Sequence, residues 1–187
     1  MPRLTVFNHV SLDGYFVDRN GEMSWAKADP QDAEWNEFVS GNTTGDGTLV
    51  FGRVTYEMMA AFWPTPMATQ MMPDVAAGMN RMAKLVFSRT LTEASWQNTT
   101  LMKGDLLSEI RKRKAGAGTD MVILGSGTLV TQLAPERLID VFQLVVNPVV
   151  LGAGRTLFEG AKDKIPLKQT ASRAFRNGNV LLTYEPL

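Results

Sequence analysis

Two glycine-containing segments have residue types that could bind phosphate groups. One reads Gly-Ser-Gly-Thr at 125–128 and follows the apolar run 121–124, and the other reads Gly-Arg-Val-Thr at 52–55 and follows the run 48–51. In each, a glycine lets the backbone approach an anion closely, and the start of the following helix would face the anion with free N–H groups. Two such junctions in one small chain predict a ligand with more than one phosphate contact. A dinucleotide is the natural candidate.

Each glycine segment also has a purely structural interpretation. The segment at 125–128 is only part of the G-x-G-x-x-G fingerprint, because the third glycine would fall on Val130. This segment could be a tight turn between a strand and a helix, and the one at 52–55 could be an ordinary helix start with an exposed arginine. Together the two segments favour phosphate binding more than either does alone.

A third candidate follows another predicted strand. Ser88 and Arg89 end the strand 84–88, and ligands of open α/β sheets bind at the carboxyl ends of strands. A serine–arginine pair there would suit an adenosine 2′-phosphate and would favour NADPH over NADH. The alternative is a polar strand exit without a ligand.

The hydrophobic patterning predicts elements that would bring these segments to one edge of a sheet. Strands alternate with helices and end in a strand pair turned at Asn177-Gly178, which indicates a mixed, mostly parallel α/β sheet with a C-terminal antiparallel hairpin. The expected strands are 3–10, 15–17, 48–51, 84–88, 95–101, 121–124, 141–150 with a kink or bulge at Pro148, 167–175 and 179–185. The expected helices are 30–40 with Pro30 near its start, 53–61, 105–114 and 127–133, and residues 64–82 are expected to form an irregular excursion and then a short helix.

Composition limits the possible functions. The 187 residues fit a single domain over 1–187. Lys+Arg and Asp+Glu both number 19, and the resulting net charge of zero argues against nucleic acid as the main partner. The absence of cysteine excludes disulfides and thiolate metal sites, and a single histidine disfavours a histidine-based metal site. We expect a cytoplasmic protein without membrane partners, since no segment resembles a signal peptide or approaches the roughly 20 apolar residues of a membrane span.

Three further features favour structural roles. His9 lies within the first strand, where a satisfied, partly buried histidine is expected more than a catalytic one. The basic run 111–114 ends a predicted helix, where the helix dipole favours cations. Seven of the 11 methionines lie between Met58 and Met82. Core packing is the default role for them, and a pocket wall or a subunit interface is the alternative.

Four motifs together resemble the C-terminal reductase domain of riboflavin biosynthesis, the RibD C-terminal family, which shares the dihydrofolate reductase fold. They are Ser11-Leu12-Asp13-Gly14 followed by Trp25, and the segments 52–57, 125–129 and 148–158. The motifs occur in the family's order and span essentially the whole chain. The resemblance implies a three-layer αβα fold, NADPH-dependent reduction of a small molecule, and a homodimer.

The resemblance also implies roles for particular residues. Asp13 would lie beside the cleft, and Val10 and Trp25 would line its nicotinamide side. Ser88 and Arg89 would contact the ribose phosphate of adenosine. A second phosphate-facing helix start would comprise Gly52, Arg53 and Thr55, and the pyrophosphate loop would comprise Gly125, Ser126, Gly127, Thr128 and Leu129.

Two departures from the family pattern point away from the riboflavin intermediate. Its ribose phosphate is held partly by arginines, whereas the helix at 31–38 contains none, and Leu124 stands where an acid usually precedes the glycine loop. The same helix resembles the acid-bearing helix of dihydrofolate reductase, in which Asp32 could help to protonate a pterin ring. The alternative, which we favour, is that Asp32 caps the first helical turn.

The leading hypothesis is therefore an NADPH-dependent reductase resembling 5-amino-6-(5-phosphoribosylamino)uracil reductase. Hydride would pass to a C=N or C=O carbon of a small heterocyclic substrate. One alternative is a pterin or folate reductase with Asp32 as a catalytic acid, and Asp13 is a second candidate catalytic residue to which we assign no particular step. Others are a nucleotide-binding homologue without turnover and a dimeric scaffold that uses the methionine-rich segment as its interface.

Overall fold

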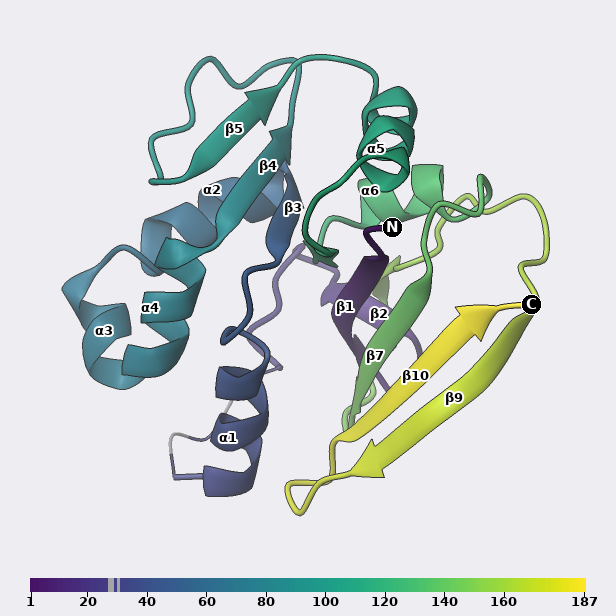
Figure 1. Ribbon diagram of the computed structural model, residues 1–187. Helices are drawn as coiled ribbons and strands as arrows, with labels where there is room; N and C mark the ends of the chain where they lie inside the picture. Colours follow the sequence, from purple (N-terminus) through teal and green to yellow (C-terminus); the bar gives the residue numbers. More distant parts are fainter. Residues whose placement is uncertain (27–28, 30) are drawn as a thin grey trace.

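The centre of the fold is an eight-stranded sheet of order β5-β4-β3-β6-β1-β7-β10-β9 (Figure 1). The computed structural model describes residues 1–26, 29 and 31–187. Neighbouring strands from β5 to β7 are parallel, whereas β10 pairs antiparallel with both β7 and β9. The predicted mixed sheet and its C-terminal hairpin are therefore confirmed. The strands are β1 (Leu4–Ser11), β3 (Thr48–Gly52), β4 (Ala83–Phe87), β5 (Thr99–Met102), β6 (Met121–Leu124), β7 (Val141–Asn147), β9 (Leu167–Ala174) and β10 (Val180–Pro186).

Helices cover both faces of the sheet. Because side chains alternate along a strand, Leu4 and Val6 of β1 point to one face, where they share a buried cluster with α5 and α6. Phe7 points to the other face and packs against Phe38 of α1. The helices are α1 (Ala33–Gly41), α2 (Arg53–Phe62), α3 (Pro66–Met71), α4 (Pro73–Arg81), α5 (Leu106–Ala115) and α6 (Gly127–Leu133).

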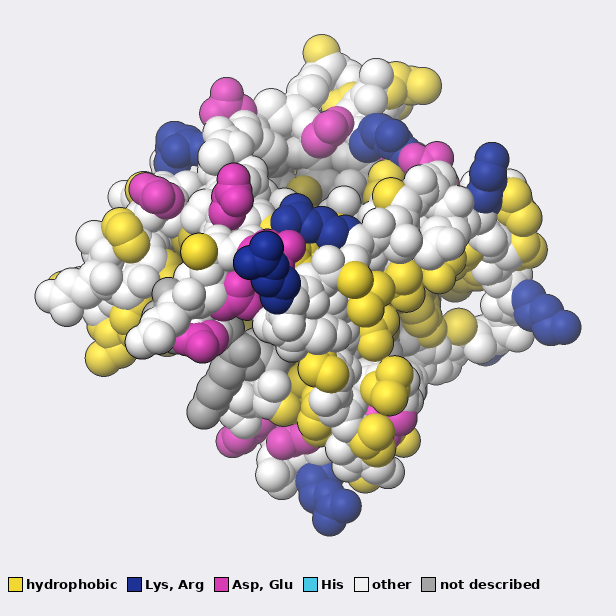
Figure 2. All heavy atoms as spheres, turned by 90° about the horizontal axis from the view of Figure 1, so that it is seen from below, with side chains coloured by type: hydrophobic (Ala, Val, Ile, Leu, Met, Phe, Trp, Pro, Cys, Tyr) yellow, Lys and Arg dark blue, Asp and Glu magenta, His cyan; other side chains and the backbone are white. Residues whose placement is uncertain are grey.

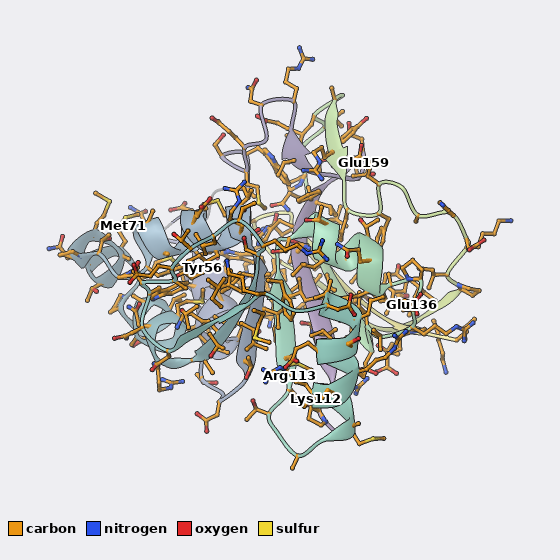
Figure 3. The ribbon with its side chains drawn as sticks, turned by 90° about the horizontal axis from the view of Figure 1, so that it is seen from above. Tyr56, Met71, Lys112, Arg113, Glu136 and Glu159 are labelled. Carbon is orange, nitrogen blue, oxygen red and sulfur yellow. The ribbon has the colours of Figure 1, made fainter. Side chains whose placement is uncertain are left out.

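Helices α2 to α4 form a wing beside α1 with a core of its own (Figure 1). Phe51 and Leu49 of β3 pack there with Tyr56 of α2 and Met79 of α4. The Tyr56 hydroxyl accepts a hydrogen bond of 2.9 Å from the Trp96 backbone N–H. Figure 3 shows Tyr56 inside this wing and Met71 at its outer end. The wing forms one side of the site described below.

Three local predictions were wrong. The short helix expected at the end of residues 64–82 is present as α4, but a second helix, α3, takes the place of the irregular excursion before it. Pro66 and Pro73 each occupy the first turn of a helix, where a missing N–H costs nothing. The strand expected over 95–101 begins only at Thr99. Strand β7 ends at Asn147, so Pro148 follows the strand instead of kinking it. Pro30, expected near the start of a helix, lies outside the described residues.

A second sheet consists of two strands, β2 (Tyr15–Asp18) and β8 (Gly154–Thr156). A strand was predicted over 15–17, but none was predicted at 154–156, because three residues are too few to show a hydrophobic pattern. The strands pair closely: a Cβ on Gly154 would lie 2.0 Å from the backbone oxygen of Val17. Gly154 also has a φ of 153°, which disfavours other residues. This second sheet therefore depends on glycine at this position.

The basic run 111–114 lies at the C-terminal end of α5. Arg113 pairs with Glu109 at 3.0 Å, Arg111 with Glu136, and Lys114 with Asp140. Figure 3 shows Lys112 and Arg113 far from Tyr56, and Figure 2 shows basic and acidic side chains interspersed on the face in view. These contacts support the structural interpretation of the run. No helix among the described residues is long and apolar enough to cross a membrane.

Candidate functional site

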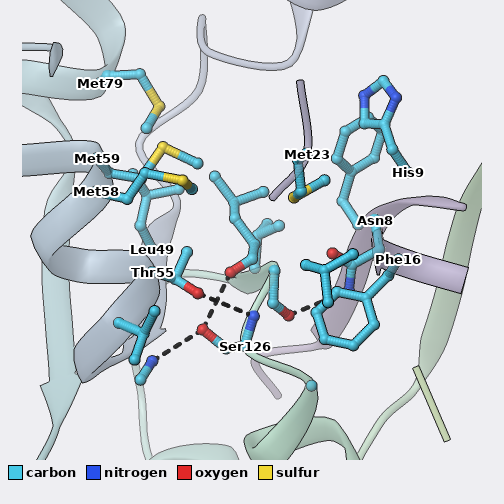
Figure 4. Close-up of a pocket in the computed structure, with 18 of the residues that line it drawn as sticks. Asn8, His9, Phe16, Met23, Leu49, Thr55, Met58, Met59, Met79 and Ser126 are labelled. Carbon is cyan, nitrogen blue, oxygen red and sulfur yellow. Dashed lines mark hydrogen bonds between the residues drawn. The ribbon is translucent and has the colours of Figure 1, made fainter. Parts of the chain in front are cut away.

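A cavity of about 620 Å³ opens where β1, β3 and β6 end (Figure 4). Both glycine junctions line it, since the carboxyl ends of parallel neighbouring strands meet at one edge of a sheet. Seven of the predicted cofactor-binding residues contribute to its wall, namely Gly52, Arg53, Thr55, Gly125, Ser126, Gly127 and Thr128.

The two glycine junctions are joined by hydrogen bonds centred on Ser126. Its backbone N–H donates to Thr55 Oγ1 at 3.1 Å, and its Oγ accepts from the Gly52 backbone N–H at 2.9 Å. The same hydroxyl donates to the Leu124 carbonyl at 3.2 Å. These bonds are visible as dashed lines in Figure 4. The junctions therefore form one unit, and two of their polar groups hold that unit together instead of facing a ligand.

The backbone of the 125–128 loop explains its glycines. Gly125 and Ser126 both adopt left-handed conformations, with φ of 60° and 54°. A Cβ on Gly125 would lie 3.0 Å from the Thr55 side chain, and a Cβ on Gly127 would lie 2.7 Å from the ring of Phe16. Each glycine therefore permits a close approach between segments that are distant in sequence. The hydrogen bonds of Ser126 offset the energetic cost of its left-handed backbone conformation.

Positive charge is concentrated at the loop side of the cavity. Helix α2 begins directly after Gly52 without a side-chain cap, and its first residue is Arg53. Arg53 pairs with Glu57 at 2.8 Å and remains half exposed. Arg155 lies 5.8 Å from the centre of the Phe16 ring, next to the loop, and pairs with Glu159. A helix start and two guanidinium groups can bind an anionic ligand there.

The opposite part of the cavity is apolar, and Figure 4 shows its methionines well away from Ser126. Four methionines of the segment 58–82 line it, and Trp63 donates its indole N–H to Met59 Sδ at 3.1 Å. Met67 and Met71 instead lie exposed on α3. The segment thus contributes to a pocket wall as well as to the core. The four lining residues are Met58, Met59, Met79 and Met82.

Seven other predicted site residues do not line the cavity. Val10 is buried in the core beneath α5 and α6, and the Trp25 indole donates to the Glu22 carbonyl at 3.2 Å. Leu129 is buried in the same core, behind the loop. Ser88 Oγ accepts hydrogen bonds from two backbone N–H groups of the following turn, and Arg89 is exposed. The remaining two, Asp13 and Asp32, are acids.

Asp13 joins the turn after β1 to the segment after β7. Its carboxylate accepts hydrogen bonds from the Ser11 hydroxyl at 2.7 Å and from the backbone N–H groups of Leu151 and Gly152 at 3.1 and 2.7 Å. These donors, the Ser11 hydroxyl above all, lower the pKa of Asp13 to about 2. A carboxylate held in this way positions a loop and is a poor proton donor at neutral pH.

The pKa of Asp13 predicts a specific acid sensitivity. Because the folded-state pKa lies below the ordinary value of 3.8, the carboxylate stabilises the fold fully above pH 3.8, and this contribution is lost as the pH falls through about 2. Asp13→Asn should therefore destabilise the protein at pH 7, with a difference from wild type that shrinks towards pH 2. Urea unfolding across this range measures it, with the exposed loop variant Asp46→Asn as control. An equal difference at all pH values would contradict the assignment.

Asp32 caps helix α1. Its carboxylate accepts from the Trp35 backbone N–H at 3.0 Å, and its other oxygen accepts from Asn177 Nδ2 at 2.8 Å. The structure thus shows the capping arrangement, with the β9–β10 turn fastened to the start of α1. Asp32 does not line the cavity.

Sequence reasoning missed the polar groups that β1 and β7 supply to the cavity. Asn8, His9 and Gln143 line it, and Asn8 Nδ2 donates to the Gly125 carbonyl at 3.1 Å. Asn8 takes a buried position of β1 in line with Leu4, Val6 and Val10, and a polar residue at an otherwise apolar position of a strand is the signal that could have revealed it. Among the described residues, no group of three or more His, Asp or Glu side chains is placed to hold a metal ion.

Solved structures share this architecture. The chain superposes on a protein assigned to riboflavin biosynthesis from Shewanella sp. PV-4 with a TM-score of 0.76, at 24% identity and 99% coverage of both chains. It also superposes on Enterococcus faecalis dihydrofolate reductase complexed with NADP(H), with a TM-score of 0.63, 17% identity and coverage of 98% of this chain and 96% of the reductase. A Thermotoga maritima deaminase/5-amino-6-(5-phosphoribosylamino)uracil reductase gives a TM-score of 0.65 at 13% identity, covering all of this chain and 57% of the longer protein. The sheet and these neighbours define a dihydrofolate reductase-like α/β protein, as predicted.

The sequence places the chain in one family of this fold. The RibD C-terminal domain model matches residues 2–181, and the chain belongs to that family. Among curated proteins, it is 31% identical to the uncharacterized protein YyaP of Bacillus subtilis over 175 residues, which cover 94% of this chain and 90% of YyaP. Protein YwjB of the same organism is 26% identical over 178 residues, covering 94% of each chain. The family resemblance read from the four motifs is confirmed.

Proposed function

We propose that this protein is an NADPH-dependent reductase of a small heterocyclic compound. One observation carries the proposal: the two glycine junctions of adjacent strands are locked into a single unit at the cavity, with Arg53 and Arg155 beside it. Membership of the RibD C-terminal domain family supports it. The homodimer implied by the resemblance remains part of the proposal.

The residues present fit a dinucleotide laid along the sheet edge. The 125–128 loop and the start of α2 would hold the pyrophosphate, since both line the cavity and the α2 start has no side-chain cap. Gly52 pairs with Phe87 in the sheet, so Ser88 and Arg89 follow one strand further along the same edge. This placement supports their assignment to the adenosine phosphate, outside the cavity proper.

When bound, NADPH would supply a hydride to an electrophilic C=N or C=O carbon. The protein's own residues would orient the two reactants and exclude water. The loop unit around Ser126 would orient the reactants, and the apolar methionine-lined wall would exclude water. Asp13 and Asp32 both accept two or more hydrogen bonds from the fold, so the proposed reduction assigns the proton donor to neither.

The experiment that tests the proposal is a titration with NADPH and NADH, followed by nicotinamide fluorescence. Saturable NADPH binding with weaker NADH binding is expected, and no binding of either would overturn the proposal. Binding without oxidation of NADPH by any pteridine, imine or quinone would support a homologue without turnover.

Arg89→Ala gives a sharper form of the same test. Removal of one charge-assisted contact to a 2′-phosphate should weaken NADPH binding about tenfold and leave NADH binding unchanged. Lys168→Ala removes a charge from β9, at the opposite end of the sheet, and is the control. If Arg89→Ala weakened the binding of NADPH and NADH equally, Arg89 would not contact the 2′-phosphate that distinguishes the two nucleotides.

A pterin or folate reductase is disfavoured by the geometry of Asp32. The proposed catalytic acid would need a free carboxyl group in the cavity, whereas both oxygens of Asp32 are engaged by Trp35 and Asn177. Methotrexate competition together with loss of activity in Asp32→Asn would restore this alternative.

A further inference from the structure

His9 is the one histidine of the chain, and it faces the cavity from the end of β1. Its ring is held edge-on between Trp35, with ring centres 5.6 Å apart, and Phe7, at 5.9 Å. Nδ1 faces the side chain of Asn147 on β7. The ring orientation is therefore fixed by packing on both sides and by a polar contact at one nitrogen.

The Asn147 amide determines which nitrogen of His9 carries the hydrogen. Its Nδ2 lies 3.0 Å from the Val145 carbonyl and 3.2 Å from the Val10 carbonyl, and its two hydrogens are used by these acceptors. The 3.3 Å contact between Nδ2 and His9 Nδ1 would need a third hydrogen. Asn147 Oδ1 lies 3.5 Å from Nδ1 and has no other donor among the residues that the structure describes, so His9 Nδ1 carries the hydrogen and donates it.

The second ring nitrogen of His9 is left as an acceptor without a protein partner. No hydrogen bond to Nε2 occurs among the described residues, and Nε2 is not among the buried polar atoms that lack a partner. Nε2 is therefore not completely enclosed by the described residues, and the residue that carries it lines the cavity. An unprotonated imidazole nitrogen in an apolar wall can accept one hydrogen bond from a ligand.

The part of the cavity near His9 lacks charge. Of the described residues that line the cavity, only Arg53 and Arg155 are charged, and both belong to the glycine-loop side. Figure 4 shows His9 away from Ser126, with Met58, Met59 and Met79 on the other side of the view. A phosphate in this part would lose its hydration without gaining a cationic partner from the described wall.

From this arrangement we infer that the substrate is a neutral, non-phosphorylated ring compound whose ring N–H donates a hydrogen bond to Nε2 of His9. The inference rests on the proposed function, because it names the compound that would lie beside the bound nicotinamide. Burial lowers the pKa of His9, so the ring is neutral at pH 7 and keeps its acceptor. His9 thereby selects the substrate and takes no part in proton transfer.

Two probes that differ at their ring nitrogens test this inference. Lumazine has ring N–H groups, and 1,3-dimethyllumazine carries methyl groups in place of two of them. We would measure the binding of both to the wild-type protein by calorimetry, with and without NADP⁺. The expected result is about tenfold tighter binding of lumazine, as for the loss of one hydrogen bond in a desolvated site.

Variants of His9 separate the hydrogen bond from the bulk of the methyl groups. His9→Phe keeps a ring between Trp35 and Phe7 and removes the acceptor, so the preference for lumazine should fall to about onefold while NADPH affinity is unchanged. His9→Gln can offer an amide oxygen and should restore part of the preference. No binding of lumazine to the wild type, or an undiminished preference in His9→Phe, would overturn the inference. Loss of NADPH binding in the wild type would instead overturn the proposed function.

Discussion

Ser126→Ala should lower the free energy of unfolding by about 1–3 kcal/mol, because it leaves the partly buried Gly52 N–H without its acceptor. It should also weaken NADPH binding by tenfold or more, since the α2 start and the 125–128 loop would no longer be held in register. Chemical unfolding and NADPH titration measure the two effects. The control is Ser172→Ala, which makes the same change at an exposed position of β9.

A second substitution at this position separates backbone strain from hydrogen bonding. Ser126 adopts a left-handed conformation, which costs a non-glycine residue about 1–2 kcal/mol. Ser126→Gly removes this strain together with the hydroxyl, so its loss of stability should be smaller than that of Ser126→Ala. Its loss of NADPH affinity should be as large. If both variants bound NADPH like the wild type, the link between the junctions would be structural only.

Gly78→Ala should destabilise the protein by about 2–3 kcal/mol, although the same change in an open helix would stabilise it. Gly78 lies within α4, and a Cβ there would lie 2.5 Å from both the Cβ and the backbone oxygen of Thr43. Thr43 is itself buried, and its carbonyl accepts from Arg81 Nη2 at 3.0 Å. The helix must therefore move away from the loop after α1, because no flexible side-chain end can yield.

The matched control is Gly41→Ala at the end of α1, where a Cβ would meet nothing within 4 Å. This variant should be neutral or slightly stabilising in thermal unfolding. Since Val75, Met79 and Met82 bring α4 to the cavity wall, Gly78→Ala should also weaken lumazine binding more than NADPH binding. A stable Gly78→Ala protein would show that the contact between α4 and the 42–44 loop is easily displaced.

The sheet was predictable because its strands carry strong local patterns. Runs such as 48–51 and 121–124 are largely apolar and are each followed by glycine. The sequence therefore indicates both that they are strands and where each strand ends. Strand β8 has only three residues and forms through contact with β2, which is remote in sequence. The burial of Lys84 could not be predicted from the sequence either. Lys84 lies in an apolar strand, and its buried ammonium group donates hydrogen bonds to the carbonyls of Met82 and Gln97.

The candidate site was predictable in part for the same reason. Glycine spacing located the two junctions, but it could not reveal that Ser126 uses its N–H and its hydroxyl to join them. Asp13 was predicted beside the cleft, and its partners at 151–152 are backbone groups that carry no residue signature. His9 was expected to be partly buried and satisfied, whereas within the described part of the chain only its Nδ1 has a hydrogen-bond partner. Its role depends on Asn147, whose proximity follows from the pairing of β1 with β7.

The position of β1 has a consequence for biosynthesis. This first strand is paired on one side with β6 and on the other with β7, so Thr5 lies between Val122 and Val141. A growing chain therefore releases β1 long before either neighbour has been made. The segment has no sheet neighbour until β6 at residues 121–124 has been made, and its second edge stays unpaired until β7 follows at residues 141–147, as expected for a topology dominated by distant pairings. Premature release of the chain before residue 141 would leave β1 an open edge, and chaperone dependence should be greatest for such truncated products.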